Sequence, residues 1–399
     1  MMDIVINPKR LQGEVRAIPS KSQAHRLLIC AAFSASPTQL ICQQTNADIE
    51  ATAQCLRALG ADISRKDWGY EISPISAFSQ TAVLDCGESG STLRFLLPIV
   101  GALGVDATFL LAGRLPQRPL SPLWEEMERM GCRLERPTPQ TLRCVGRLKA
   151  GDYHISGSVS SQYISGLLWA LSLIPGKSTL EITGKIESAP YIAMTEKALE
   201  IFGVKISLPN LSYAYPFQSP GELAVEGDWS NGAFFLAAGA LGSLVSVTGL
   251  EEDSPQGDRA AKALLEALEE HITIDAGDIP DLVPILSVVA AAKKGAVFTN
   301  IRRLRLKESD RVASVSQMLS RLGVKTHAEE NSFTVYPGTF QGCTIDSAAD
   351  HRIAMAAAIA ATIAQGPVTI LGAQCVEKSY PSFWEDYKES GGRYEQYLR

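Results

Sequence analysis

The chain has 399 residues, of which 46% are hydrophobic and 20% charged, and its formal net charge is −6. These values are typical of a globular protein that is long enough for two domains. The acidic balance argues against a nucleic-acid or membrane-surface partner, and no apolar run reaches membrane-spanning length. The eight cysteines and five histidines show no metal-ligand spacing. We therefore expect reduced thiols, a cytoplasmic location and no metal site.

Six short polar segments along the chain each lead into a helix-like run of small apolar residues. A second unit recurs behind them, in which a glycine closes a helix and a strand follows. The spacing of roughly 70 residues suits a supersecondary unit with two helices. Because helix N-termini attract anions, six such starts delivered to one region predict an anion-binding site. The polar segments begin at Pro19, Gly87, Val159, Gly227, Gly277 and Ala349, and the closing glycines are Gly60, Gly131, Gly203 and Gly323.

Strand-like runs such as TAVLDC (81–86) and PVTILG (367–372) lie between the helical patterns, which predicts an α/β fold. Helices such as GLLWALSLI (166–174) are apolar nearly all round, so we expect helices inside and sheets outside. The segment 225–241 restarts the repeat, which predicts two similar halves of three units each. A doubly wound Rossmann sheet is the competing layout, but no G-x-G-x-x-G follows a strand.

The first helix start, PSKSQAHRLL, combines two cations with capping hydroxyls. Ser20 or Ser22 can cap the helix, and Arg26 lies about one turn beyond Ser22 on the same face. With Lys21 and the exposed backbone N–H groups, this end can hold an anion. A capped surface helix with solvated cations explains the same residues, and both interpretations stay open for this motif.

The segment LRLKESDRVASV (304–315) places a carboxylate between two cations at a predicted helix start. Lys307 and Arg311 are spaced to share a helix face, and Glu308 between them can transfer a proton to a docked substrate. A surface network of ion pairs is an equally good explanation.

Three further segments carry candidate binding groups. Ser160, Ser161 and Gln162 place two hydroxyls and an amide at one helix start, which suits a phosphate or sugar-like hydroxyls. Arg352 brings a cation to the last start. Arg118 and Lys378 lie in proline-bounded loops, where binding residues occur but solvated cations are commoner.

Ten motifs, in order, resemble the 5-enolpyruvylshikimate-3-phosphate synthase family of enolpyruvyl transferases: PSKSQAHR, GESGSTLR, QRP, SSQ, SAPYI, EGDWS, IPD, LKESDR, DHRIAM and EKSYPSFW. The resemblance implies two inside-out α/β barrel-like domains, each of three βαβαββ repeats. One domain would hold residues 1–20 plus 229–399, the other residues 21–228, with the active site in the cleft between them. It further implies a reaction that joins phosphoenolpyruvate to shikimate 3-phosphate and releases phosphate, without cofactor or metal. From the sequence itself we expect a monomer with no nucleic-acid or membrane partner.

The same resemblance assigns roles to residues. The phosphoenolpyruvate group comprises Lys21, Gly90, Arg118, Gln162, Arg311, Arg352 and Lys378, with the pair Arg311 and Arg352 gripping the carboxylate. The shikimate 3-phosphate group comprises Lys21, Ser22, Arg26, Ser160, Ser161, Gln162, Ser188, Tyr191, Asp281 and Lys307. Glu308 is the candidate for proton transfer at the methylene carbon, and Lys21 and Asp281 assist at the hydroxyl and the departing phosphate.

Two positions depart from the family pattern, and two alternative functions remain. Glu88 stands in a loop that often reads G-N-[AS]-G-T, and Arg303 stands where many members place an asparagine. The sister transferase that uses a UDP-sugar, UDP-N-acetylglucosamine, carries a reactive loop cysteine, whereas Cys86 here ends a strand and Cys132 follows a helix-closing glycine. A non-catalytic relative that only binds a phosphorylated ligand would be expected to lack one of the three proton-transfer candidates.

Overall fold

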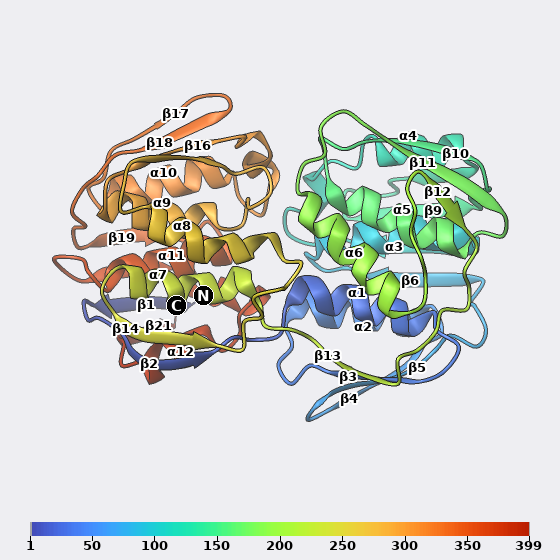
Figure 1. Ribbon diagram of the computed structural model, residues 1–399, viewed down its shortest axis with the longest axis horizontal. Coiled ribbons are helices and arrows are strands. Elements are labelled where there is room, and N and C mark those ends of the chain that lie inside the picture. Colours follow the sequence, from blue (N-terminus) through green and yellow to red (C-terminus); the bar gives the residue numbers. More distant parts are fainter. Residues whose placement is uncertain (1, 399) are drawn as a thin grey trace. The chain divides into compact units, whose positions relative to one another are not determined.

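The computed structural model describes residues 2–398, which divide into two compact units (Figure 1). We call Pro19–Val225 the inserted unit. The terminal unit combines the chain up to Ile18 with everything from Glu226 onward. No helix within residues 2–398 is long and apolar enough to cross a membrane.

The inserted unit is built from three sheets and six α-helices across its described residues. The sheet orders are β13-β3-β5-β4, β6-β7-β9-β8 and β10-β11-β12. The strands are β3 (Thr38–Ile41), β4 (Asp62–Lys66), β5 (Gly69–Ser73), β6 (Thr81–Asp85), β7 (Asp106–Leu110), β8 (Cys132–Glu135), β9 (Thr141–Gly146), β10 (Asp152–Ser156), β11 (Lys177–Thr183), β12 (Asn210–Ser212) and β13 (Glu222–Ala224). The helices are α1 (Lys21–Ala32), α2 (Ala47–Ala58), α3 (Gly90–Leu103), η1 (Leu115–Gln117), α4 (Leu123–Arg129), α5 (Ser161–Leu173) and α6 (Ala189–Ile201).

The terminal unit repeats this plan within the part of it that the structure describes. Its sheet orders are β19-β20-β1-β21, β15-β16-β18-β17 and the pair β14-β2. The strands are β1 (Met2–Asn7), β2 (Gln12–Arg16), β14 (Leu244–Thr248), β15 (Ile272–Asp275), β16 (Ala296–Thr299), β17 (Thr326–Ala328), β18 (Ser332–Val335), β19 (Cys343–Asp346), β20 (Val368–Leu371) and β21 (Arg393–Leu398). The helices are α7 (Trp229–Ala240), η2 (Gly257–Ala260), α8 (Ala261–Ala267), α9 (Val283–Ala292), η3 (Arg302–Leu306), α10 (Arg311–Arg321), α11 (His351–Ala361), η4 (Ala373–Lys378) and α12 (Phe383–Glu389).

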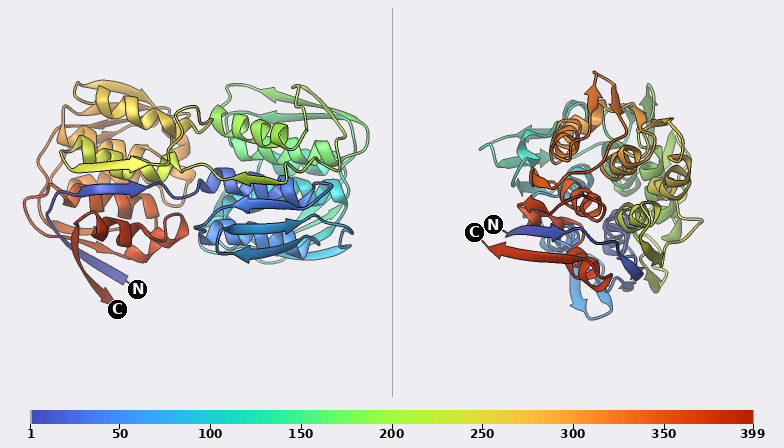
Figure 2. Two further views of the ribbon diagram at one scale, coloured as in Figure 1. Left: turned by 60° about the horizontal axis from the view of Figure 1, so that its bottom comes forward. Right: turned by 90° about the vertical axis from the view of Figure 1, so that its left-hand side faces the viewer.

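A βαβαββ copy is complete in each unit. In the inserted unit it runs β6-α3-β7-α4-β8-β9, with β6 and β7 parallel and β9 antiparallel to both β7 and β8. In the terminal unit it runs β15-α9-β16-α10-β17-β18 with the same pairing directions. Two other sheets pair strands that are far apart in the sequence: β13 pairs with β3, and β1 lies side by side with β21 (Figure 2). The predicted supersecondary repeat is therefore confirmed.

The first helix of each copy forms the core of its unit. All eleven residues of α11 are buried, and α3 and α5 are buried along nearly their whole lengths. The strands alternate between buried and exposed residues, as in β6, so one face of each sheet covers these helices. A side chain at Gly166 of α5 would collide with the Arg94 carbonyl of α3, so glycine permits this close packing. Helices inside and sheets outside were predicted and are confirmed.

One helix begins later than the sequence predicts. Lys307 and Glu308 lie in the loop between η3 and α10, and the helix starts only at Arg311. Asp310 has extended backbone angles and accepts a hydrogen bond from the Ala313 N–H, so it is the N-cap. The prediction that Lys307 and Arg311 share a helix face is therefore wrong.

Candidate functional site

Five of the six predicted helix starts are capped by the side chain of the N-cap residue. Ser20 accepts a hydrogen bond from the Gln23 N–H and caps α1, while Ser89 and Ser160 cap α3 and α5 in the same way. Asp228 and Asp350 cap α7 and α11. The fifth predicted start differs, because the N-cap position of α9 is Leu282, which makes no side-chain cap.

Lys21 is the first residue of α1 and forms a largely buried ion pair. Its Nζ lies 3.1 Å from Oδ2 of Asp48 in the first turn of α2, and the two side chains are 16% and 9% exposed. Asp48 therefore fixes the ammonium group at the end of the helix. Asp48 was not predicted as a site residue, because an acidic residue in a first helical turn already has a local explanation.

Arg26 joins α1 to α6. Its guanidinium donates to the Thr195 hydroxyl at 2.9 Å, to the Tyr191 carbonyl at 2.8 Å and to the Ser22 carbonyl at 2.5 Å. Thr195 in turn donates to Ser165 of α5 at 2.8 Å. Burial lowers the pKa of Arg26 to about 10, so the group stays charged at neutral pH. Arg26 lies one turn beyond Ser22 within α1, as predicted.

A second group of side chains gathers where α3 meets α5. Gln162 accepts from Nη1 of Arg94 and donates to Ser91, both at 2.9 Å. A Cβ on Gly90 would lie 2.7 Å from Nη1 of Arg118 and 2.8 Å from Nη1 of Arg94. Two guanidinium groups therefore flank the Gly90 backbone, where a side chain would displace them. Arg94 was not predicted as a site residue, although it closes the GESGSTLR motif.

Ser188 and Tyr191 hold the start of α6. Ser188 occupies the N-cap position in the left-handed region, with φ 57°, and is buried. Its carbonyl accepts from the Tyr191 N–H at 3.1 Å. A non-glycine residue in this region is uncommon and is often found at functional sites.

Arg311 is the hub of the terminal unit. Its side chain is 1% exposed, and its Nε donates to Oδ2 of Asp350 at 2.9 Å. Nη1 lies 2.5 Å from Oδ1 of Asp281, and Nη2 lies 2.7 Å from Oε2 of Glu308. Burial alone would lower its pKa, but Asp350, Glu308 and Asp281 raise that pKa well above the ordinary value. Asp350 was not predicted as a partner of Arg311.

Asp281 forms ion pairs with three cationic side chains. Besides Arg311, Lys307 Nζ lies 3.5 Å from Oδ1, and Arg352 Nη2 lies 3.3 Å from Oδ2. Burial acts to raise the pKa of Asp281, but Arg352, Lys307 and Arg311 outweigh it and hold the pKa well below the usual range. Burial lowers the pKa of Lys307 to about 8, although the Asp281 charge opposes this shift. Lys307 therefore titrates near physiological pH.

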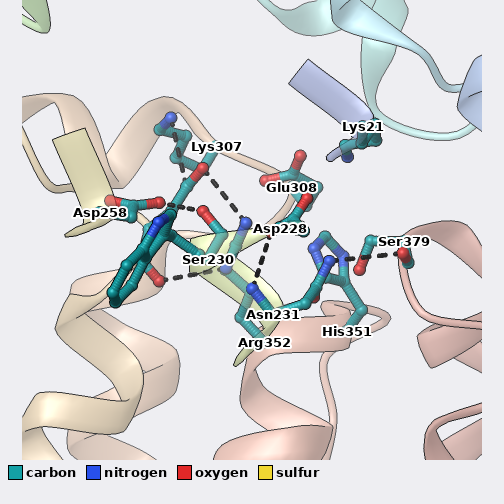
Figure 3. A network of polar contacts seen from close by, with 12 residues as sticks. Lys21, Asp228, Ser230, Asn231, Asp258, Lys307, Glu308, His351, Arg352 and Ser379 are labelled. Carbon is teal, nitrogen blue, oxygen red and sulfur yellow. Dashed lines mark hydrogen bonds and ion pairs between the residues drawn. The ribbon is translucent and has the colours of Figure 1, made fainter. Parts of the chain in front are cut away.

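The loop that carries Lys378 is tied to the start of α7. Asn231 donates to the carbonyl of Ser379, the residue after Lys378, at 3.4 Å (Figure 3). Lys378 itself is half-buried at the end of η4. The first turn of α7 thus helps to hold this loop.

The predicted site residues are divided between the two units. The inserted unit contains Lys21, Ser22, Arg26, Gly90, Arg118, Ser160, Ser161, Gln162, Ser188 and Tyr191, and the terminal unit contains Asp281, Lys307, Glu308, Arg311, Arg352 and Lys378. Within the terminal unit, ion pairs join all of these residues except Lys378 into one network. Among residues 2–398, no cluster of His, Cys, Asp and Glu side chains is arranged to hold a metal ion.

Of the two departures from the family pattern, Glu88 lies in the inserted unit and Arg303 in the terminal unit. Glu88 is exposed, and its carboxyl group lies against Gly113, where a Cβ would meet it. Arg303 is half-buried within η3, and its charge adds to the downward shift of the Lys307 pKa, which burial dominates.

Comparisons with known proteins agree on one family. The family model described as EPSP synthase (3-phosphoshikimate 1-carboxyvinyltransferase) matches residues 5–387. Proteins named 3-phosphoshikimate 1-carboxyvinyltransferase are similar over nearly their whole length. The one from Clostridium kluyveri is 36% identical, covering 100% of this chain and 99% of that protein. The one from Clostridium perfringens is 37% identical, covering 98% and 99%.

Solved structures of low sequence identity share the fold. The EPSP synthase of Acinetobacter baumannii has a TM-score of 0.82 at 22% identity, covering 100% of both chains. The enolpyruvyl transferase NikO of Streptomyces tendae has a TM-score of 0.76 at 17% identity, covering 100% of this chain and 99% of that one. The predicted fold class is confirmed. Because a family model matches nearly the whole chain and close relatives align along their full lengths, the chain belongs to the EPSP synthase (3-phosphoshikimate 1-carboxyvinyltransferase) family.

Proposed function

We propose that the chain transfers the enolpyruvyl group of phosphoenolpyruvate to the 5-hydroxyl of shikimate 3-phosphate and releases inorganic phosphate. Family membership supports this reaction, as do the curated relatives named for it. The observation that carries most weight within the molecule is the buried network of Arg311, Asp281 and Glu308, with Lys307 and Arg352 beside it. It combines cations for anionic substrates with two carboxylates for proton transfer.

Binding of the phosphoenolpyruvate carboxylate is assigned to Arg311 and Arg352. Both terminal nitrogens of Arg311 are already engaged, one by Asp281 and the other by Glu308. Each of these nitrogens carries a second N–H, so a substrate carboxylate can bind beside the two side chains or displace one of them. Displacement of Glu308 would release its carboxyl group for proton transfer when the substrate arrives.

The remaining anionic groups are assigned to the helix starts of the inserted unit. Lys21, Arg118 and Gln162, with Lys378 of the terminal unit, bind the phosphate of phosphoenolpyruvate. A second set holds shikimate 3-phosphate: Ser22, Arg26, Ser160, Ser161, Ser188 and Tyr191 of the inserted unit, with Lys307 of the terminal unit. Supporting observations are the ion pair that fixes Lys21, the two guanidiniums around Gly90 and the Ser160 cap.

The chemistry proceeds by addition and elimination. The 5-hydroxyl oxygen bonds to C2 of phosphoenolpyruvate while a proton adds to C3, so the methylene becomes a methyl group. Glu308 delivers that proton, and Asp281, kept ionised by its three cations, orients the hydroxyl and receives its proton. In the second step the C2–O bond to phosphate breaks, the phosphate leaves with the proton held by Asp281, and one methyl proton returns to Glu308, which restores the enol ether and both side chains. Lys21 stabilises the departing phosphate.

Phosphate release tests this proposal. The purified chain receives phosphoenolpyruvate with shikimate 3-phosphate, with EDTA present, and each substrate alone serves as the control. We expect release that needs both substrates, and a loss of at least about 100-fold in Glu308→Gln, the usual scale for a general acid–base group. Release with UDP-N-acetylglucosamine instead of shikimate 3-phosphate would identify the sister transferase activity. Saturable binding without release would favour a binding-only relative.

We also propose that the chain acts as a monomer in a reducing cytoplasm. All eight cysteines are free thiols, and six of them are buried. Free cysteines are typical of proteins from reducing compartments. Light scattering during size-exclusion chromatography measures the mass in solution, and a value near twice 43.0 kDa would contradict the monomer.

A further inference from the structure

Asp258 is a buried carboxyl group that the mechanism above does not use. It is the second residue of η2 and is 2% exposed. The hydroxyl of Ser230, in the first turn of α7, donates a hydrogen bond to its Oδ2 (Figure 3). Among the described residues, its Oδ1 is buried and has no hydrogen-bond partner. This arrangement suits a neutral acid, because an ionised carboxylate with one unpaired buried oxygen is costly.

The charged groups around Asp258 favour the same state. Burial and the nearby Asp281 carboxylate raise the pKa of Asp258 to about 7, against the opposing charge of Arg352. Asp228, the N-cap of α7, adds a further negative charge. The neighbouring cations on η2 and α8 do not compensate, because Arg259 donates to the Glu252 carbonyl and Lys262 pairs with the exposed Glu252 side chain.

Asp258 therefore stands beside the pair that the proposed reaction needs. Arg352 contacts Asp281 twice, through Nη2 to Oδ2 at 3.3 Å and through Nη1 to the backbone carbonyl at 3.3 Å. A second negative charge next to this pair would compete for Arg352 and repel an anionic substrate. A neutral Asp258 leaves Arg352 available to both Asp281 and the substrate.

We propose that Asp258 is a positioning residue that, held neutral by its burial, leaves Arg352 paired with Asp281 and free of a competing charge when the carboxylate of the substrate binds. This role rests on the proposed function, since it assumes that Arg352 binds phosphoenolpyruvate. When Asp258 ionises, its negative charge attracts Arg352 and competes with the substrate carboxylate for the guanidinium group. The affinity for phosphoenolpyruvate then falls as pH rises through the Asp258 ionisation, with little change in the affinity for the other substrate.

The first test measures kcat and KM for phosphoenolpyruvate between pH 5.5 and 9. This range extends from about 1.5 units below to about 2 units above the Asp258 pKa. We expect kcat/KM to fall up to about tenfold per pH unit above about 7 in the wild type, mainly through KM. Asp258→Asn keeps the shape and stays neutral, so this fall disappears. Ser230→Ala removes a hydrogen bond that favours the ionised form, so the fall shifts to higher pH. An unchanged profile in Asp258→Asn would overturn the positioning role.

A second test does not depend on activity. The pKa of Asp258 is raised in the folded chain from 3.8 to about 7, so its stabilising contribution is present at low pH and is lost as pH rises through about 7. The Tm of Asp258→Asn minus that of the wild type should therefore increase between about pH 4 and 7. Asp106→Asn is the contrasting control: its hydrogen bonds with Arg143 lower the pKa of Asp106, so the corresponding difference in Tm should not increase over this pH range.

The two tests separate the possible failures. A difference in Tm that stays constant with pH would overturn the neutral state of Asp258, whatever the kinetics show. The expected Tm trend with an unchanged kinetic profile would overturn only the link to Arg352. If the wild type shows no transfer at any pH, the proposed function fails, and the Tm trend still decides the state of Asp258.

Discussion

Asp350 offers the sharpest test of the buried network in the terminal unit. Its two oxygens face three donors: Oδ2 accepts from Arg311 Nε at 2.9 Å and from Ser309 at 3.0 Å, and Oδ1 accepts from the Arg352 N–H at 3.0 Å. The side chain is fully buried. In Asp350→Asn, the amide NH2 must face either Arg311 or the Arg352 N–H. Both are donors, so one buried donor is left unsatisfied whichever way the amide turns.

The cost follows from that contact set. Removing one partner of a buried ion pair costs about 3–5 kcal/mol, but Arg311 retains Asp281 and Glu308, which reduces the loss. Asparagine is as good an N-cap as aspartate, so α11 keeps its cap when the amide oxygen faces the Arg352 N–H. We therefore expect Asp350→Asn to lower the free energy of unfolding by about 2–4 kcal/mol.

Asp310→Asn is the matched control. Asp310 caps α10, also in the terminal unit, but its side chain is 39% exposed and its pairing with Arg305 is long, at 3.5 Å. The same substitution there should cost less than about 1 kcal/mol. Scanning calorimetry should show a Tm lower by roughly 5–15 °C for Asp350→Asn and by no more than about 4 °C for Asp310→Asn. Equal shifts in the two variants would refute the network as a source of stability.

Three further outcomes are expected. Gly90→Ala should raise the KM for phosphoenolpyruvate about tenfold in steady-state kinetics, because the new Cβ displaces the Arg118 and Arg94 guanidiniums; an unchanged KM would contradict their assignment. Lys307 carries its charge below its pKa of about 8, so kcat/KM for shikimate 3-phosphate should fall above that pH and should not fall in Lys307→Arg; a fall that persists there assigns the titration elsewhere. Thr195→Val removes the acceptor of Arg26 Nε and should lower the free energy of unfolding in urea by about 1–2 kcal/mol. The control, Thr179→Val at an exposed site, should lower it by less than about 0.5 kcal/mol, and equal losses would contradict the role of the Arg26 contact.

Local chemistry made much of the fold predictable. Ser20, Ser89 and Ser160 precede apolar runs and cap their helices as the sequence indicates. The closing glycines at positions 60, 131, 203 and 323 all adopt positive φ, the conformation that ends a helix without a Cβ penalty. These features depend only on neighbours in the chain, so the sequence alone carries them.

The site was less predictable, because its contacts join distant segments. Lys307 and Arg311 do meet, but at Asp281 about thirty residues earlier in the chain rather than along one helix. Asp350 and Arg94 each belong to a recognised motif, yet their partners, Arg311 and Gln162, lie in other motifs. Spacing along the chain does not show which of these residues pair, since pairing depends on burial and on the geometry of the folded chain.

The most direct test of the central claim is proton NMR of the reaction run in D2O with phosphoenolpyruvate and shikimate 3-phosphate. Addition and elimination pass through a methyl group that contains one solvent-derived hydrogen. The account predicts a new enol ether whose vinyl methylene carries deuterium, formed only when both substrates are present. A product with a fully protonated methylene would contradict the addition step, and no product at all would contradict the proposed function.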